Sequence, residues 1–281
     1  MSVFSVNIGG KLVDLSSPCV MTIINVTPDS FYAGSRITDD DQLIGSVGRA
    51  LEDGAGLLDI GGYSSRPGAT DISPEEEGDR VCRALESIRE HFGYFPISVD
   101  TFRSEVVERV LETWGPFLVN DITAGEGDPR MIPVVAANGL PYVAMHMRGT
   151  PQTMTGLTQY GDVVDEVLDY FVRKLAELDA AGVHEVIADV GFGFAKTVEQ
   201  NFELLRRLDE FSVLGVPILS GISRKSMIWK PLGITPAEAL AGTTALNWEL
   251  LRKGTHIIRV HDTAEAVQTV RLFECYRTKE A

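Results

Sequence analysis

Short apolar runs rich in β-branched residues recur along the chain, and polar, turn-forming residues follow them directly. The most informative transition follows the apolar run 19–24, where the chain changes to Asn25-Val26-Thr27-Pro28-Asp29-Ser30-Phe31. Continuous apolar runs of this length are typical of parallel strands that are covered on both faces. We therefore predict eight strands, at residues 20–26, 57–61, 97–100, 118–121, 142–146, 186–189, 218–220 and 257–261.

Amphipathic stretches with apolar residues at helical spacing lie between these runs. They cover residues 42–52, 74–92, 104–113, 163–181, 198–211 and 236–253. Ser73-Pro74 and Thr235-Pro236 each place a capping residue and a first-turn proline at a helix start. The longest stretch without a pattern, residues 147–160, is predicted to be a loop over the carboxyl ends of the strands.

Strands and helices alternate along the whole chain, which is 281 residues long. Eight βα units within this length favour an α/β fold of the closed (β/α)8 TIM barrel type over an open doubly wound sheet. No low-complexity linker or shift of composition marks a second domain. We therefore expect one domain spanning residues 1–281.

Composition limits the classes of function. The formal net charge of -15 argues against a nucleic-acid-binding protein, which needs a basic face for phosphate contacts. An anionic ligand would need a local cluster of Lys, Arg or metal. The three cysteines, Cys19, Cys82 and Cys275, form no CxxC motif, so we expect reduced thiols rather than disulfides or a zinc site.

Neither a basic amino-terminal region followed by a long apolar stretch nor a run of about 20 apolar residues is present in the sequence. We therefore expect a cytoplasmic protein with no membrane partner.

Candidate chemistry lies where the predicted strands end, because active sites of such barrels occupy the carboxyl ends of the strands. A single polar residue there is as easily a structural cap, but so many together indicate a shared site. The candidates are Asn25, Asp59, Ser65, Arg66, Asp100, Asn120, Asp121, His146, Arg148, Asp189, Ser223, Arg224, Lys225, Arg259, His261 and Asp262.

Two chemically distinct groups stand out. The first, Asp100, Asn120 and Asp189, offers carboxylates and an amide suited to the N–H donors of an amino-substituted heterocycle. The second, Lys225, Arg259 and His261, follows the seventh and eighth strands, where barrels often bind phosphate.

Asn25 offers a neutral oxygen suited to Mg²⁺, which takes few protein ligands and completes its shell with phosphate and water. The alternative for Asn25 is a cap of the Thr27-Pro28 turn. The segment 191–197, Gly-Phe-Gly-Phe-Ala-Lys-Thr, resembles a nucleotide phosphate loop only superficially, because Ala195 stands where a glycine is needed. Its glycines instead suit a tight turn beside a ligand.

Several ordered motifs together resemble the dihydropteroate synthase family of the folate pathway, and the resemblance runs from about residue 21 to residue 262. The motifs are Asn25-Val26-Thr27-Pro28-Asp29-Ser30-Phe31, Ser65-Arg66-Pro67-Gly68-Ala69, Val99-Asp100-Thr101, Asn120-Asp121, Met145-His146-Met147-Arg148-Gly149-Thr150-Pro151, Gly191-Phe192-Gly193-Phe194, Ser223-Arg224-Lys225-Ser226 and Arg259-Val260-His261-Asp262.

The resemblance implies a barrel enzyme, targeted by sulfonamides, that joins 6-hydroxymethyl-7,8-dihydropterin pyrophosphate to p-aminobenzoate, with Mg²⁺ as cofactor and a homodimeric assembly. It implies departure of pyrophosphate before the arylamine attacks, with catalytic roles for Lys225, Asp100 and Arg66. The implied binding residues are Asp100, Asn120, Asp189 and Lys225 for the pterin, Arg259 and His261 for pyrophosphate, Asn25 for the metal, and Ser65, Phe194 and Ser223, with Arg66 and Pro67 alongside, around p-aminobenzoate.

Two positions depart from the family pattern. Tyr63 stands where the family usually has glutamate, and Val190 stands where it usually has proline. We expect both changes to alter loop geometry and pocket shape rather than the reaction. The competing hypotheses are a pterin-binding methyltransferase, which the cationic group and the Ser-Arg-Lys-Ser motif disfavour, and a non-catalytic paralogue, which the intact Asn25, Asp189, Lys225 and His261 disfavour.

Overall fold

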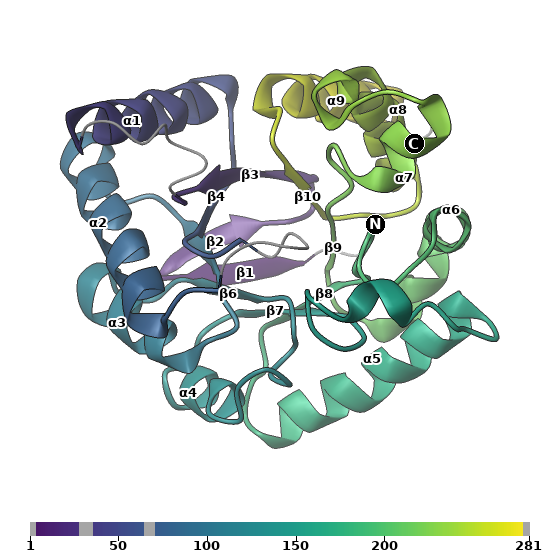
Figure 1. Cartoon of the computed structure of the whole chain (residues 1–281), viewed down its shortest axis with the longest axis horizontal. Helices are drawn as coiled ribbons and strands as arrows, with labels where there is room; N and C mark the ends of the chain where they lie inside the picture. Colours follow the sequence, from purple (N-terminus) through teal and green to yellow (C-terminus); the bar gives the residue numbers. More distant parts are fainter. Residues whose placement is uncertain (1–3, 28–35, 65–70, 278–281) are drawn as a thin grey trace.

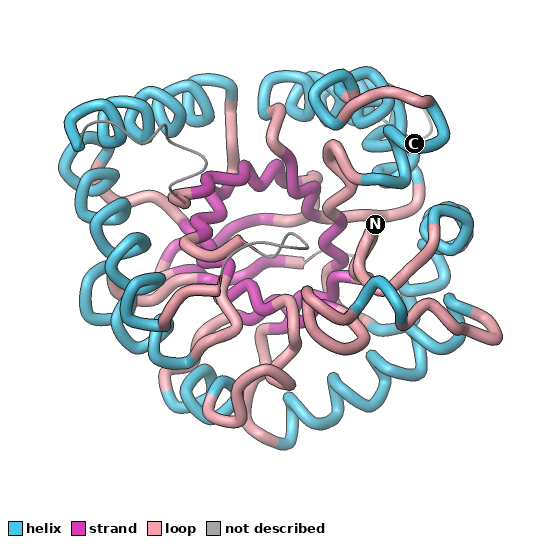
Figure 2. The backbone as a smooth tube through the Cα atoms, in the orientation of Figure 1, coloured by secondary structure: helices cyan, strands magenta, loops and turns pink. Residues whose placement is uncertain are grey.

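Eight parallel strands close into a barrel at the centre of the molecule (Figure 2). The computed structural model describes residues 4–27, 36–64 and 71–277. The barrel strands are β3 (Cys19–Asn25), β4 (Leu57–Gly61), β5 (Ile97–Asp100), β6 (Leu118–Asp121), β7 (Tyr142–Met145), β8 (Val186–Asp189), β9 (Ile218–Ser220) and β10 (Ile257–Val260). β10 pairs with β3 and closes the barrel, so the predicted (β/α)8 fold is confirmed.

Helices surround the barrel as an outer ring (Figure 1). They are α1 (Arg36–Asp53), α2 (Pro74–Phe92), α3 (Ser104–Trp114), α4 (Met131–Ala137), α5 (Val163–Ala180), α6 (Val198–Arg206), α7 (Ser226–Leu232), α8 (Leu240–Arg252) and α9 (Thr263–Arg277). Three 3₁₀ turns, η1 (Met154–Gly156), η2 (Leu208–Leu214) and η3 (Pro236–Glu238), lie in the connections. The cap predicted at Ser73 is present, since its side chain accepts a hydrogen bond from the Glu76 amide.

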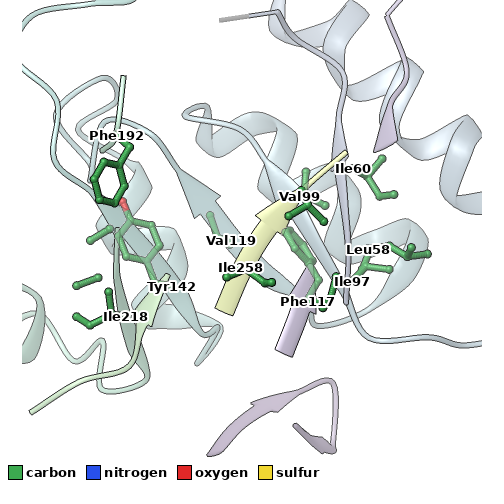
Figure 3. Packing of buried hydrophobic residues seen from close by; sticks show 14 of the residues in the cluster. Leu58, Ile60, Ile97, Val99, Phe117, Val119, Tyr142, Phe192, Ile218 and Ile258 are labelled. Atoms are coloured by element: carbon green, nitrogen blue, oxygen red, sulfur yellow. The ribbon is translucent and has the colours of Figure 1, made fainter. Parts of the chain in front are cut away.

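The main core lies between the barrel and the helices. Side chains alternate between the two faces of a strand, so every second residue points outward. Figure 3 shows these outward residues, among them Leu58 and Ile60 of β4 and Ile97 and Val99 of β5. All four are fully buried. The strands are apolar along their length because both of their faces are buried.

A two-stranded hairpin, β1 (Ser5–Ile8) and β2 (Lys11–Asp14), precedes the barrel. It lies across the far end of the barrel in Figures 1 and 2. Val6 and Ile8 pack there against inward residues at the starts of strands, such as Leu57 and Leu118. The hairpin therefore closes the amino-terminal end with an apolar plug, and the opposite end carries the polar residues.

No helix within the described residues combines the length and apolar character needed to cross a bilayer. All three cysteines are free thiols, as the sequence predicts, with Cys19 and Cys82 buried and Cys275 exposed.

Candidate functional site

The carboxyl ends of the strands carry an inward-facing layer of polar side chains, which we call the polar layer. It consists of Asp59 on β4, Asp100 on β5, Asn120 on β6, Asp189 on β8 and Arg259 on β10. The register places Asp100 directly beside Asn120 and Met145 beside Asp189. Residues far apart in the sequence therefore meet at one end of the barrel, where the sequence predicts a shared site.

Arg259 and Asp59 organise one side of the polar layer. The Arg259 guanidinium donates from Nε to Asp59 Oδ2 at 2.6 Å and from a terminal nitrogen to Asp100 Oδ2 at 2.7 Å. Asp59 is fully buried, and both its oxygens also accept from Asn120 Nδ2, at 3.3 and 3.2 Å. Since the Asn120 amide nitrogen is committed to Asp59, its oxygen remains as the acceptor for a ligand.

Burial shifts the ionisation of this group. It raises the pKa of Asp100 to about 7, although the nearby Arg259 charge acts in the opposite direction. Burial alone would lower the pKa of Arg259, but the charges of Asp59 and Asp100 outweigh that effect and raise it. Arg259 is therefore a fixed cation, while Asp100 can lose or gain a proton near neutral pH.

Asp189 and Lys225 form the other side of the site. Burial raises the pKa of Asp189, against the opposing charge of Lys225, and Asp189 Oδ1 accepts from the Gly191 amide at 2.8 Å. Burial lowers the pKa of Lys225 to about 8. The Lys225 amine donates to the Phe192 carbonyl at 2.6 Å and lies 4.7 Å from the centre of the Phe194 ring.

The turn after β9 brings Ser223 against the end of β10. Ser223 Oγ lies 3.0 Å from His261 Nδ1 and accepts from the His261 amide at 3.2 Å. Arg224 adopts a left-handed backbone with φ of 56° and binds both oxygens of Asp262. This ion pair stabilises a backbone conformation that is unfavourable for a residue with a side chain, and so it fixes the positions of Ser223 and Lys225.

Asn25 ends β3 at the same end of the barrel. A side chain added at Gly61 would meet Asn25 Oδ1 at 3.5 Å and Asp100 Cβ at 3.6 Å, so the two residues lie close together. Within the described residues, no three His, Cys, Asp or Glu side chains are grouped to hold a metal. A single amide oxygen beside a carboxylate fits Mg²⁺ only where a ligand supplies the remaining oxygens.

The geometry of this site agrees with comparisons to known proteins. The sequence profile described as "Pterin binding enzyme" matches residues 21–261. The chain belongs to this family. The dihydropteroate synthase of Escherichia coli (strain K12) is 42% identical over 270 residues, which cover 94% of each chain.

Solved structures of pterin binding enzymes share the fold. The Xanthomonas albilineans dihydropteroate synthase with 4-aminobenzoic acid has a TM-score of 0.90 at 35% identity, over 98% of this chain and 99% of that chain. A Yersinia pestis dihydropteroate synthase with a sulfonamide drug complex has a TM-score of 0.91 at 36% identity, over 98% and 100% of the two chains. The resemblance inferred from the motifs is thereby confirmed at the level of the family.

The structure brings together most of the site residues that the sequence predicts for a pterin binding enzyme. These are Asn25, Asp100, Asn120, Asp189, Phe194, Ser223, Lys225, Arg259 and His261, and all belong to strand ends or the turns that follow. Ser65, Arg66 and Pro67 lie outside the described residues. Arg259 is predicted from the sequence to belong to the phosphate-binding group, but its guanidinium is hydrogen-bonded to Asp59 and Asp100. Arg259 therefore links the predicted phosphate-binding group to the predicted heterocycle-binding group.

The two departures from the family pattern occupy different surroundings. The Tyr63 hydroxyl accepts from Gln152 at 3.2 Å, and its ring meets Phe102 edge-on at 5.2 Å. It therefore joins the loops that follow three different strands. Val190 is fully buried in the core between the barrel and the helices.

The motifs did not reveal the roles of two residues, Asp59 and Lys196, in holding the site together. Asp59 was a candidate by position, but its link to both Asn120 and Arg259 spans 61 and 200 residues of sequence. Lys196 was set aside with the false phosphate loop, yet its amine is buried against His146. The only available signal was a lysine followed closely by a helix start at Thr197.

Proposed function

We propose that this protein is a transferase that condenses 6-hydroxymethyl-7,8-dihydropterin pyrophosphate with p-aminobenzoate, giving 7,8-dihydropteroate and pyrophosphate. The observation that carries the proposal is the polar layer, in which three carboxylates, an amide and the Arg259 cation converge at the carboxyl ends of five strands. The 42% identity to the E. coli dihydropteroate synthase supports it. A Xanthomonas albilineans relative with 7,8-dihydropteroate bound has a TM-score of 0.86 at 33% identity, over 97% and 98% of the two chains.

Recognition of the pterin ring is the role that we propose for Asp189, Asn120 and Asp100. A carboxylate accepts hydrogen bonds from two adjacent N–H donors, which matches the 2-amino group and the neighbouring ring N–H of a pterin. Asn120 contributes its free carbonyl oxygen. Asp59 holds Asn120, Arg259 holds Asp100, and the Gly191 amide holds Asp189, so these groups do not need to reorganise when the ring binds.

The reaction that we propose is a dissociative substitution at the pterin methylene carbon. The bond to pyrophosphate breaks first, and the arylamine nitrogen of p-aminobenzoate then forms the new bond and releases a proton. Asp100 and Asp189 stabilise positive charge on the pterin, while the Lys225 ammonium contacts a pterin oxygen. Arg66 is proposed as the third catalytic residue.

Pyrophosphate binding is the role that we propose for Arg259 and His261, with Asn25 as the protein ligand of Mg²⁺. When bound, the metal would neutralise negative charge on the leaving group. Arg259 supports this assignment because it stays charged, and His261 because its ring is held against Ser223.

Binding of p-aminobenzoate is proposed for Phe194, Ser223 and Ser65, with Arg66 and Pro67 at its edge. The Phe194 ring lies 4.7 Å from the Lys225 amine and so borders the residues proposed to bind the pterin. We propose that sulfonamides occupy this pocket too, in line with the Yersinia pestis complex. We further propose that the protein is cytoplasmic and forms a homodimer. Sedimentation of the purified protein would test the homodimer.

Turnover of the two substrates by the purified protein is the decisive test. We expect 7,8-dihydropteroate to form and excess chelator to abolish its formation, because the local cations neutralise only part of the pyrophosphate charge. Asn25→Ala should raise the Mg²⁺ concentration needed for half-maximal rate and leave p-aminobenzoate binding nearly unchanged. Full turnover in chelator would remove the metal from the proposal, and an unchanged Mg²⁺ requirement would remove Asn25.

A further inference from the structure

One lysine of the loop that joins β8 to α6 has its amine enclosed against the preceding residues of the same loop. Lys196 is 8% exposed, and its amine lies 3.0 Å from the Gly191 carbonyl oxygen, 3.1 Å from the Phe194 carbonyl oxygen and 3.0 Å from His146 Nδ1. An ammonium group has three N–H donors, and three acceptors surround this one. Two of the acceptors are near the two ends of one short loop, so the amine ties that loop together.

The surroundings of this amine are unusual for a lysine. Burial lowers the pKa of Lys196 to about 7 and that of His146 to about 2, so His146 is neutral and accepts through Nδ1. Enclosing a cationic group costs free energy unless its donors are satisfied. The three acceptors around the Lys196 amine offset this cost, and they fix the amine in one position relative to the loop.

Residues 191–194 of this loop contact Asp189 and Lys225 of the candidate site. The Gly191 amide donates to Asp189, the Phe192 carbonyl accepts from Lys225, and the Phe194 ring lies below the Lys225 amine. Gly191 has φ of 70°, and a side chain there would lie 2.0 Å from the His146 carbonyl oxygen. The loop thus has little room to shift without disturbing Asp189 and Lys225.

A second buried side chain holds the middle of the same loop. Asn201 of α6 is 1% exposed and accepts from the Gly193 amide at 2.7 Å, and its own amide donates to the Thr197 carbonyl at 2.6 Å. Asn201 leaves the Gly191 and Phe194 carbonyls to Lys196. The two side chains therefore act at different points of the loop.

We propose that Lys196 is a positioning residue, whose amine fixes the loop 191–194 so that the Phe192 carbonyl and the Phe194 ring keep the Lys225 amine in place. The proposal rests on the proposed function, since Lys225 is assigned there to the pterin. Lys196 itself touches no substrate in this scheme. It acts on the reaction only through the loop.

The test compares Lys196→Met with Lys174→Met, because Lys174 is an equally buried lysine, 7% exposed, whose amine binds Glu177 on α5. We expect Lys196→Met to lower kcat about 10- to 100-fold, the size of effect seen when reacting groups are misplaced by about 1 Å. KM for p-aminobenzoate should rise with the displaced Phe194. Calorimetric binding of a pterin analogue should weaken as well, because Lys225 is assigned to the pterin, and Lys174→Met should keep wild-type kcat, KM and pterin affinity.

Hydrogen exchange supplies a readout that does not depend on activity. The Phe194 amide donates to the Gly191 carbonyl at 3.1 Å, so its exchange should accelerate in Lys196→Met and stay unchanged in Lys174→Met. Absence of wild-type turnover would refute the proposed function, while the exchange data would still decide whether Lys196 holds the loop.

Wild-type turnover with equal kinetics in the two Met variants would overturn the positioning role. If Lys196→Met does not fold, Lys196→Gln keeps two N–H donors in a shorter side chain, and Lys174→Gln is its control. A lower kcat in Lys196→Gln than in Lys174→Gln would support the proposal, and equal values would overturn it.

Discussion

The two ends of the barrel interior are built from the same strands but differ completely in chemistry. At the end covered by the β1–β2 hairpin, inward positions are apolar, and two residues later on the same strands they are polar. The pairs are Leu57 and Asp59, Leu118 and Asn120, Ile187 and Asp189, and Ile257 and Arg259. Residues two apart share one face of a strand, so roughly 7 Å separates an apolar layer from the polar layer.

The difference teaches how this barrel separates stability from function. Apolar side chains at the covered end remove surface from water and stabilise the fold. The polar layer instead encloses carboxylates, and burial of their charge costs free energy. That cost is seen in the raised pKa values of Asp100 and Asp189. A group held at such a cost is a candidate for ligand binding.

Truncation in the apolar layer should give the largest change in stability. Ile187 is fully buried, and Ile187→Ala should lower the free energy of unfolding by about 2 to 5 kcal/mol because it leaves a cavity. Affinity for a pterin analogue should remain near that of the wild type, since Asp189 keeps its strand position. Denaturant unfolding and calorimetry measure the two quantities, and a large loss of affinity with unchanged stability would contradict the separation.

The matching change in the polar layer is Asp189→Asn, two residues further along β8. An amide offers one acceptor where the carboxylate offers two, so pterin affinity should fall by about 2 to 5 kcal/mol with little change in volume. The ligand-free variant should unfold at nearly the wild-type temperature. Equal pterin affinity, or failure to fold, would assign Asp189 to the structure of the barrel rather than to the site.

The barrel was predictable because each strand is buried on both faces and so leaves a local apolar run. Five of the eight strands, including β5 (Ile97–Asp100) and β8 (Val186–Asp189), have the predicted bounds, β7 and β10 end one residue earlier, and β3 is shifted by one residue at both ends. The hairpin was missed because its strands have only four residues each and β2 is mostly exposed. Gly9 and Gly10, both with positive φ, were its turn signal.

The helices were less completely predicted. The pattern missed α4 (Met131–Ala137) and α7 (Ser226–Leu232), which have only seven residues each, and also α9 (Thr263–Arg277). The stretch 198–211 was predicted as one helix, but α6 ends at Arg206 and the 3₁₀ turn η2 begins at Leu208. Local periodicity cannot resolve this break, because Arg207 is held by an ion pair to Asp162, which lies 45 residues earlier in the chain.

Which residues line the site was predictable from strand ends, but not which of them touch. The Asp59 to Asn120 hydrogen bond and the Lys196 to His146 contact join segments 61 and 50 residues apart. Only the closure of the barrel brings these residues together. The type of chemistry is therefore local in the sequence, and the network that positions it is not.

Lys225→Ala tests the polar end without altering a strand, because Lys225 lies in the turn between β9 and α7. Its amine is buried beside the Phe192 carbonyl, and loss of one preorganised electrostatic donor costs about 3 to 4 kcal/mol of transition-state stabilisation. We expect kcat/KM to fall accordingly while the free energy of unfolding changes less. Near-native kcat/KM would show that Lys225 only covers the rim of the site.

The last expected effect is the pH dependence that the polar layer imposes on stability. An unfolded aspartate loses its proton near pH 3.9, whereas burial raises the pKa of Asp100 in the folded protein to about 7. Between these values the folded protein holds a proton that the unfolded chain has released. The free energy of unfolding should therefore fall as pH rises through this window, by up to about 1.4 kcal/mol per pH unit, and the contribution should be constant above it.

His146 acts in the opposite sense below pH 6.5, because burial lowers its pKa to about 2 and only the unfolded chain takes up a proton there. The contribution of Asp100 is therefore isolated by subtracting the denaturant unfolding curves of Asp100→Asn from those of the wild type between pH 4 and 8, without ligand. We expect the difference to show the downward slope up to about pH 7 and none above it. A flat difference would mean that Arg259 keeps Asp100 ionised throughout, so that the polar layer is a permanently charged network and not one that takes up a proton when its ligand is absent.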